Sequence, residues 1–139
     1  MAEVSPDAIL HRAIERIHQV GPPYDWVGVY LLSGNHLVLH SYIGRTTDLA
    51  RIPVEQGVCG TAVAENRDIN VPDVSAVDNY LVSASETRSE IVVLIRDGER
   101  VLGLIDVDSD VPAAFGDDDE RVLKGIAAAL GELLGPSLR

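Results

Sequence analysis

Residues 51–74 read RIPVEQGVCGTAVAENRDINVPDV, and this stretch organises the middle of the 139-residue chain. Gly57 and Gly60 flank Cys59, which is the only cysteine in the sequence. Because glycine permits tight turns and a close approach of the backbone, the pair predicts a sharp turn into a short helix over residues 60–66. A single cysteine excludes an intrachain disulfide and a cysteine-rich zinc site.

Cys59 has two interpretations, and the neighbouring residues leave both open. A thiol just before the start of a helix has a lowered pKa, which is typical of a reactive cysteine. A free cysteine also packs well as a small buried apolar residue. The first interpretation points to redox chemistry, and the second to a wall of a core or pocket.

The composition is that of one globular domain covering residues 1–139, with 46% hydrophobic and 24% charged residues. The net charge of -11 argues against nucleic acid and anionic membranes as partners, because both attract basic surfaces. No apolar run has the length of a membrane span, and the acidic N-terminus lacks the basic and apolar regions of a signal peptide. We therefore expect a cytoplasmic protein.

Regular patterns extend outward from this stretch on both sides. Ser5-Pro6 predicts the start of an N-terminal helix over about residues 5–20, and a C-terminal helix over about 117–134 is expected to be capped by Asp117, with Glu120 three residues on. Asp97-Gly98 predicts a hairpin turn. The apolar stripe predicted for the C-terminal helix consists of Val122, Leu123, Ile126, Ala129, Leu130 and Leu133. The predicted strands lie at residues 25–32, 36–43, 52–54, 69–71, 90–95 and 100–107.

The order of these elements predicts an α+β fold: an antiparallel sheet within a core of about residues 25–110, with helices packed mostly on one face. The polar loop at residues 72–88 is unusually long, and such loops often bind or cover a ligand.

Side chains with chemical potential gather on one predicted face of this sheet. Strand alternation places Trp26 and Tyr30 together, Asp106 and Asp108 together, and Glu90 at the start of a neighbouring strand. If the three carboxylates converge in an apolar setting, a cation must offset them, and the ammonium group of a small ligand under aromatic rings suits this role.

Two other interpretations of the carboxylates stay open. Asp106 and Asp108 at the end of a strand are also compatible with simple exposure to solvent. The run DVDSD has alternating carboxylates, but it lacks the glycine and the terminal glutamate of a calcium-binding loop. The four histidines form no metal-ligand pattern, so we predict no metal site and no cofactor.

The segments DWVGVYLL (25–32), GVCGTAV (57–63), SEIV (89–92) and GLIDVDS (103–109) together resemble the GAF family, and within it the free methionine-(R)-sulfoxide reductases. The resemblance implies a six-stranded antiparallel sheet, with helices mainly on one face and loops covering a ligand pocket on the other. It also implies that Trp26 and Tyr30 line the pocket, and that Glu90, Asp106 and Asp108 hold the ammonium group of an amino acid.

The resemblance does not extend to all the redox residues. The reductase pattern has three cysteines, and this chain keeps only Cys59, with Leu49 and Val82 (or a near neighbour of Val82) at the other two positions. We therefore expect a small-molecule-binding regulatory domain without catalytic residues. It would bind methionine or its sulfoxide and form a homodimer through its terminal helices in signalling.

Two alternatives to this expectation stay open. One is a reductase that works through Cys59 and an external thiol. The other is a structural or dimerisation module with an unrelated ligand, such as a cyclic nucleotide.

Overall fold

The computed structural model describes residues 4–82 and 84–138, and in it six strands form one sheet. The sheet is antiparallel throughout, with the order β3-β2-β1-β6-β5-β4. The elements are α1 (Pro6–His18), β1 (Trp26–Ser33), β2 (His36–Ile43), β3 (Arg51–Pro53), α2 (Gly57–Glu65), β4 (Ile69–Val71), the 3₁₀ turn η1 (Val74–Ala76), β5 (Ser89–Asp97), β6 (Arg100–Ser109) and α3 (Asp117–Leu134).

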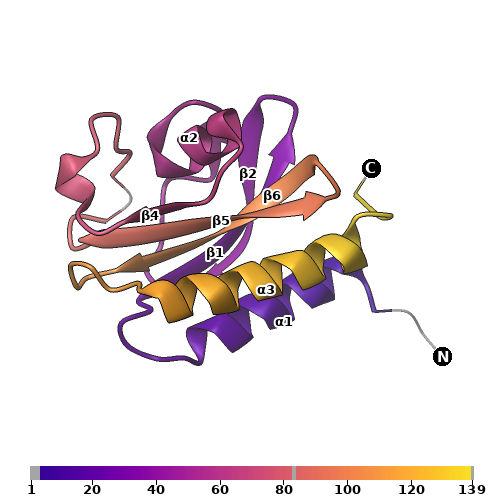
Figure 1. Ribbon diagram of the computed structural model, residues 1–139, viewed down its shortest axis with the longest axis horizontal. Coiled ribbons are helices and arrows are strands. Elements are labelled where there is room, and N and C mark those ends of the chain that lie inside the picture. Colours follow the sequence, from indigo (N-terminus) through magenta and orange to yellow (C-terminus); the bar gives the residue numbers. More distant parts are fainter. Residues whose placement is uncertain (1–3, 83, 139) are drawn as a thin grey trace.

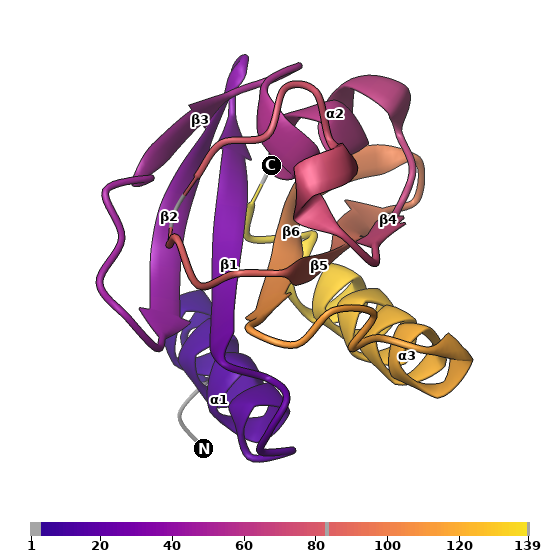
Figure 2. The same ribbon diagram turned by 90° about the vertical axis from the view of Figure 1, so that its left-hand side faces the viewer.

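The sheet separates two layers that differ in composition. The long helices α1 and α3 lie side by side against one face, whereas α2 and the segment after β4 lie on the opposite face (Figure 1). Figure 2 shows that segment passing in front of β1 before it reaches β5. This arrangement confirms the predicted α+β fold, with helices mainly on one face and loops on the other.

The layer under α1 and α3 is the main apolar core. Alternate residues of the central strands, such as Val27, Val29 and Ile105, are fully buried against Leu10 and Ile14 of α1. Burial of such a side chain stabilises the fold by about 1.5–3 kcal/mol, so this layer supplies much of the driving force for folding. The intervening residues of the same strands point to the other face of the sheet.

Two glycines allow elements to approach more closely than a side chain would permit. A Cβ atom on Gly131 of α3 would lie 1.9 Å from the carbonyl oxygen of Arg96 in β5. A Cβ atom on Gly60 of α2 would lie 2.5 Å from the carbonyl oxygen of Pro53 in β3. Gly131 thus lets α3 pack closely against β5, and Gly60 lets α2 pack closely against β3.

Strand register decides which side chains meet on the α2 face. In the β1–β6 pair, Trp26 lies opposite Asp108 and Gly28 lies opposite Asp106. In the β5–β6 pair, Glu90 lies opposite Asp108. The predicted aromatic and acidic faces are therefore parts of one continuous surface.

Three local predictions were wrong in position. Helix α2 begins at Gly57, three residues early, because Gly57 adopts a φ of 65° that side chains disfavour and turns the chain there. The hairpin predicted at Asp97-Gly98 is present, but its two connecting residues lie one position later, at 98 and 99, with Gly98 at positive φ. The N-cap of α3 is Gly116, whose N–H donates to the Asp119 carboxylate at 2.8 Å, so Asp117 is the first helical residue.

The predicted apolar stripe of α3 was partly wrong. Leu123 and Leu130 are buried as predicted, together with Ala127, Gly131 and Leu134. Val122 and Leu133 are 53% and 60% exposed, because the close contact at Gly131 turns the adjoining face of the helix toward the sheet. Both residues therefore contribute to the outer surface of α3.

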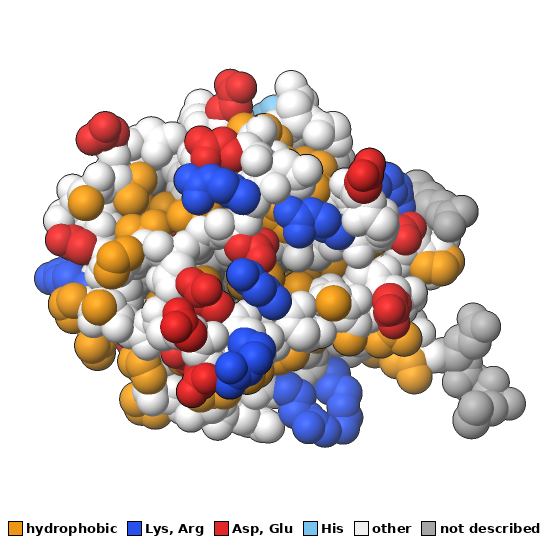
Figure 3. Space-filling model, in the orientation of Figure 1, with side chains coloured by type: hydrophobic (Ala, Val, Ile, Leu, Met, Phe, Trp, Pro, Cys, Tyr) orange, Lys and Arg blue, Asp and Glu red, His pale blue; other side chains and the backbone are white. Residues whose placement is uncertain are grey.

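The molecular surface carries mixed charge. On the face shown in Figure 3, arginine and lysine side chains lie among aspartate and glutamate rather than in a continuous basic patch. None of the helices within the described residues has both the length and the apolar character that crossing a membrane requires.

Candidate functional site

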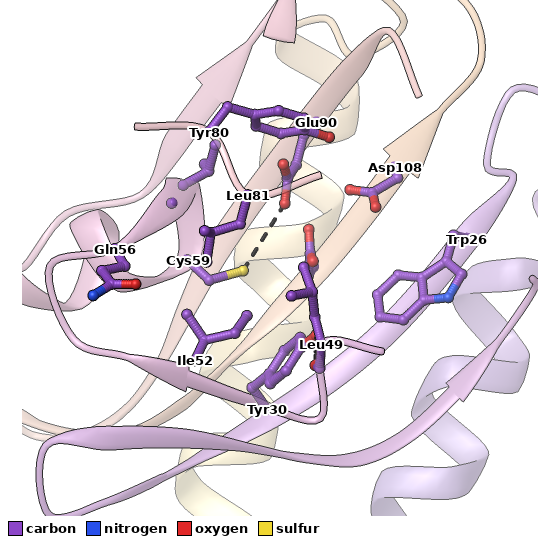
Figure 4. Close-up of a pocket in the computed structure, with 13 residues that line it drawn as sticks. Trp26, Tyr30, Leu49, Ile52, Gln56, Cys59, Tyr80, Leu81, Glu90 and Asp108 are labelled. Atoms are coloured by element: carbon purple, nitrogen blue, oxygen red, sulfur yellow. Dashed lines mark hydrogen bonds between the residues drawn. The ribbon is translucent and has the colours of Figure 1, made fainter. Parts of the chain in front are cut away.

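A pocket lies on the α2 face of the sheet, where β1, β5 and β6 meet α2 and the loop after η1 (Figure 4). Its cavity volume is about 20 Å³, which is enough for a single water-sized occupant. The lining residues are Trp26, Tyr30, Leu49, Ile52, Gln56, Gly57, Val58, Cys59, Tyr80, Leu81, Glu90, Asp106 and Asp108. All five predicted ligand-binding residues, and Cys59, are among them.

Three buried carboxyl groups converge in this pocket. Glu90, Asp106 and Asp108 are only 5–6% exposed, so the interpretation of Asp106 and Asp108 as solvent-facing residues was wrong. Among the described residues, the Oδ1 atoms of Asp106 and Asp108 are buried without a hydrogen-bond partner. Buried polar atoms are normally paired, so these two oxygens mark a place where a cationic or hydrogen-bond-donating group fits.

The carboxyl groups have unusual protonation behaviour. Burial raises the pKa of all three, and the negative charge of Asp106 raises the pKa of Glu90 and Asp108 further. No lysine, arginine or histidine is among the lining residues. The pocket therefore favours the protonated, uncharged carboxyl groups or a neighbouring positive charge.

Cys59 is the third residue of α2 and is 3% exposed. Its Sγ atom points into the pocket and donates a long hydrogen bond to Glu90 Oε2 at 3.9 Å (Figure 4). Burial and the nearby carboxylates raise the pKa of this thiol well above its ordinary value. The expected lowering of the pKa by the helix start was wrong, because desolvation and three acidic neighbours outweigh the helix end.

Trp26 forms the far wall of the pocket and is held on three sides. Its Nε1 donates to the carbonyl of Arg45 at 3.0 Å, and its ring stacks on Tyr42 with 5.5 Å between centroids. Gly28 lies directly beneath the indole, where a Cβ atom would be 2.4 Å from Cη2. The absence of a side chain at Gly28 thus lets the ring lie flat along the sheet.

Tyr30 connects the floor of the pocket to its rim. Its hydroxyl donates to the carbonyl of Leu49 at 2.7 Å, which fixes the segment before β3. Of the two positions where the reductase pattern has further cysteines, Leu49 lines the pocket, whereas Val82 is 67% exposed.

The cover of the pocket was not predicted residue by residue. Tyr80 and Leu81, from the long loop, close it, and Leu81 packs above Gly57, where a Cβ atom would lie 3.0 Å from Leu81 Cγ. The available signal was that Tyr80 is one of only four tyrosines and lies beside Leu81 in a loop rich in serine, aspartate and asparagine. Ile52 and Gln56 were also missed, because they carry no distinctive motif.

A second hollow lies between α1 and β2, where His11 and His40 meet with 5.3 Å between ring centroids. His40 Nε2 also contacts Asp7 Oδ1 at 2.7 Å. Spacing along the chain did not predict this pair, because the two histidines belong to different elements.

The family model described as GAF domain matches residues 5–134. The chain belongs to the GAF domain family. Among its curated relatives is a free methionine-R-sulfoxide reductase from Escherichia coli (strain K12), 38% identical over 110 residues, which cover 79% of this chain and 66% of the relative. This GAF domain thus spans about two thirds of the length of that relative.

Solved structures extend the similarity over nearly the whole GAF domain. The type II free methionine-R-sulfoxide reductase from Thermoplasma acidophilum has a TM-score of 0.90 and 35% identity, covering 96% of this chain and 94% of that one. The enzyme from Neisseria meningitidis, solved in complex with its substrate, has a TM-score of 0.90 and 32% identity, covering 97% of this chain and 81% of that one. Both findings confirm the similarity to these reductases.

Proposed function

We propose that this protein is a GAF domain that binds a free amino acid, methionine or methionine sulfoxide, and that it holds the ammonium group with Glu90, Asp106 and Asp108. The observation that carries the proposal is the pair of buried Oδ1 atoms that have no hydrogen-bond partner among the described residues, in a pocket whose described lining contains no basic residue. The similarity to enzymes that act on free methionine sulfoxide supports the choice of amino acid.

Charge selects the ligand class. Burying three carboxyl groups without a counter-charge costs several kcal/mol for each ionised group. An ammonium group offsets that cost, and the Trp26 and Tyr30 rings add cation–π attraction and apolar contact for a thioether side chain. A phosphate-bearing ligand such as a cyclic nucleotide would bring like charges together, so the pocket disfavours it.

Size requires the cover to move. Pockets for small molecules usually have volumes of about 300–1,000 Å³, far above the closed cavity of about 20 Å³. Tyr80 and Leu81 are the lining residues that belong to the long loop, so we expect them to move outward when an amino acid enters. The carboxylates lie on central strands and stay in place.

Binding without turnover is the function that the thiol favours. A nucleophilic cysteine reacts as the thiolate, and burial and the carboxylates raise the Cys59 pKa. Cys59 is also the only cysteine of the chain, so no internal thiol can resolve a sulfenic acid.

Reduction of the sulfoxide is the second candidate function, and the position of the Cys59 sulfur in the pocket wall favours it. In that reaction the thiol takes the sulfoxide oxygen to become a sulfenic acid, and the sulfoxide becomes the thioether. An external thiol then attacks the sulfenic sulfur, releasing water and forming a mixed disulfide. A second external thiol regenerates the Cys59 thiol and leaves as a disulfide.

Titration calorimetry with methionine and with both sulfoxide epimers tests the binding proposal. We expect heat from at least one of them, and at least tenfold weaker binding in Asp106→Asn. Asp118→Asn is the matched control, because Asp118 is 87% exposed on α3 and pairs with Arg121. Absence of heat from all three ligands with folded protein would refute amino-acid binding.

A separate activity assay tests for turnover, with methionine-R-sulfoxide as the substrate and glutathione as the external thiol. Binding without turnover supports the regulatory function. Methionine formation that disappears in Cys59→Ser while binding persists supports the reductase. Equal turnover in both proteins would exclude Cys59 as the nucleophile.

The assembly and cellular role stay predictions. The exposed Val122 and Leu133 on α3, beside α1, support a homodimer through the terminal helices, which light scattering of wild type and Leu133→Glu would test. Signalling to a partner and a cytoplasmic location rest on the sequence argument alone.

A further inference from the structure

Three potential metal ligands meet at the closed end of the pocket. One ligand atom each from Cys59, Glu90 and Asp106 lies within 4.8 Å of the other two, and all three residues are buried. They come from α2, β5 and β6, so three separate elements hold the donors around one point. Asp108, which lines the same cavity, has a buried Oδ1 atom without a hydrogen-bond partner within the part of the chain that the structure describes.

We propose that the closed pocket binds one Zn²⁺ ion through Cys59 Sγ and the carboxylates of Glu90 and Asp106. The sequence predicted no metal site, and this ion would bind whether or not the pocket binds an amino acid. The size of the cavity suits an ion. A cavity of about 20 Å³ accepts an occupant the size of one water or one ion, whereas an amino acid requires the loop to open.

The donor set selects the metal. A thiolate with two carboxylates suits Zn²⁺, whereas Mg²⁺ and Ca²⁺ prefer oxygen ligands alone. Zinc bonds are about 2.3 Å to sulfur and about 2.0–2.2 Å to oxygen, so donors now up to 4.8 Å apart close by roughly 1 Å around the ion. Side-chain rotation of Glu90 or Asp106 supplies such a shift. The fourth position of a tetrahedral site is left for Asp108 or water.

Charge favours a divalent ion in this pocket. Zn²⁺ binds the deprotonated forms of all three ligands, so its binding releases protons. Two positive charges also offset more of the buried acidic charge than one ammonium group does. The ion and the amino acid use the same carboxylates, so each excludes the other.

Calorimetry of Zn²⁺ binding, without amino acid and after removal of metal by a chelator, tests the proposal. We expect one ion per chain and release of protons, seen as a heat that changes with the ionisation enthalpy of the buffer. Binding should weaken at least tenfold in Cys59→Ser and in Asp106→Asn. Co²⁺ in place of Zn²⁺ should give a near-ultraviolet thiolate charge-transfer band that is absent in Cys59→Ser.

The variant His40→Ala distinguishes a surface zinc site from the pocket site, because it removes one ring of the His11–His40 pair. We expect this variant to keep full Zn²⁺ binding. Loss of binding in His40→Ala with binding retained in Cys59→Ser would overturn the proposal, as would absence of Zn²⁺ binding by wild type. Fluorescence of Trp26 checks that each variant is folded, and the two pocket variants alter different elements, so a folding defect in one leaves the other as the test.

Discussion

Replacing Gly28 with alanine should displace Trp26 and damage the pocket while leaving the sheet intact. Gly28 lies in the middle of β1, paired with Tyr42 and Asp106, in a backbone conformation open to any residue. A Cβ atom there would lie 2.4 Å from Cη2 and 2.6 Å from Cζ3 of the Trp26 indole. Carbon atoms in contact normally lie about 3.5–4.0 Å apart, so the ring must move by about 1 Å.

The size of the effect follows from what the ring loses. Forcing an extra carbon into a packed site costs about 1–3 kcal/mol. Weakening the bond from Nε1 to the Arg45 carbonyl, now 3.0 Å, costs about 0.5–1.5 kcal/mol more. The better strand propensity of alanine offsets about 0.5–1 kcal/mol. We therefore expect the free energy of unfolding to fall by about 2 kcal/mol, the centre of these ranges.

Urea denaturation followed by tryptophan fluorescence measures both effects, because Trp26 is the only tryptophan. The emission of folded Gly28→Ala should differ from wild type, and methionine affinity should fall at least tenfold. Gly125→Ala is the matched control, since a Cβ there meets no atom within 4 Å, and it should gain about 0.5–1 kcal/mol from helix propensity. Wild-type stability and emission in Gly28→Ala would refute the role of Gly28 beneath the ring.

Three further predictions concern the acids, the thiol and the helix contact. Because the pKa of Asp108 is raised, its contribution to stability is present below the unfolded pKa of about 3.9 and is lost as pH rises through the folded pKa. In urea denaturation, the free energy of unfolding of Asp108→Asn should therefore equal that of wild type at pH 4 and exceed it at pH 8. An equal difference at both pH values would contradict this prediction. Cys59 should react with iodoacetamide at pH 8 far more slowly than free cysteine, because the thiol is buried and its pKa is raised. Mass spectrometry measures this rate and the faster rate expected in urea, and fast labelling of the native protein would disprove the prediction. Gly131→Ala should lose about 3 kcal/mol or more in urea denaturation, because its Cβ would meet the Arg96 carbonyl at 1.9 Å, whereas a loss below about 1 kcal/mol would show that α3 shifts freely.

The sheet and the acidic face were predictable because strand alternation is a local rule. Trp26 and Tyr30 share a face by period two, as do Asp106 and Asp108. The β5–β6 hairpin places Glu90 opposite Asp108, and the pairing of β1 with β6, which are far apart in the chain, joins the aromatic face to the acidic one. The sequence motifs resemble the GAF family, and that resemblance implied a sheet of six strands. Trp26, Tyr30, Glu90, Asp106 and Asp108 in the pocket lining followed from these two sources.

The errors lie where a non-local contact overrides a local rule. The pKa of Cys59 depends on carboxylates at least 31 positions away in the chain, and the helix position alone gave the wrong direction. The buried face of α3 depends on one glycine meeting a carbonyl of β5, which hydrophobic periodicity does not encode. Tyr80 and Leu81 reach the pocket through an irregular loop, where no period fixes side-chain direction.

If the pocket binds the proposed ligand, binding is linked to the stability of the whole protein. Among the described residues that line the pocket there is no lysine or arginine to provide a counter-charge for Glu90, Asp106 and Asp108. Without a ligand, the folded state must retain protons there, and each proton lost on raising the pH costs stability. A cation from solution removes that cost, whether it is an ammonium group or Zn²⁺. Stabilisation by ligand should therefore increase with pH, in the direction opposite to the stability of the free protein.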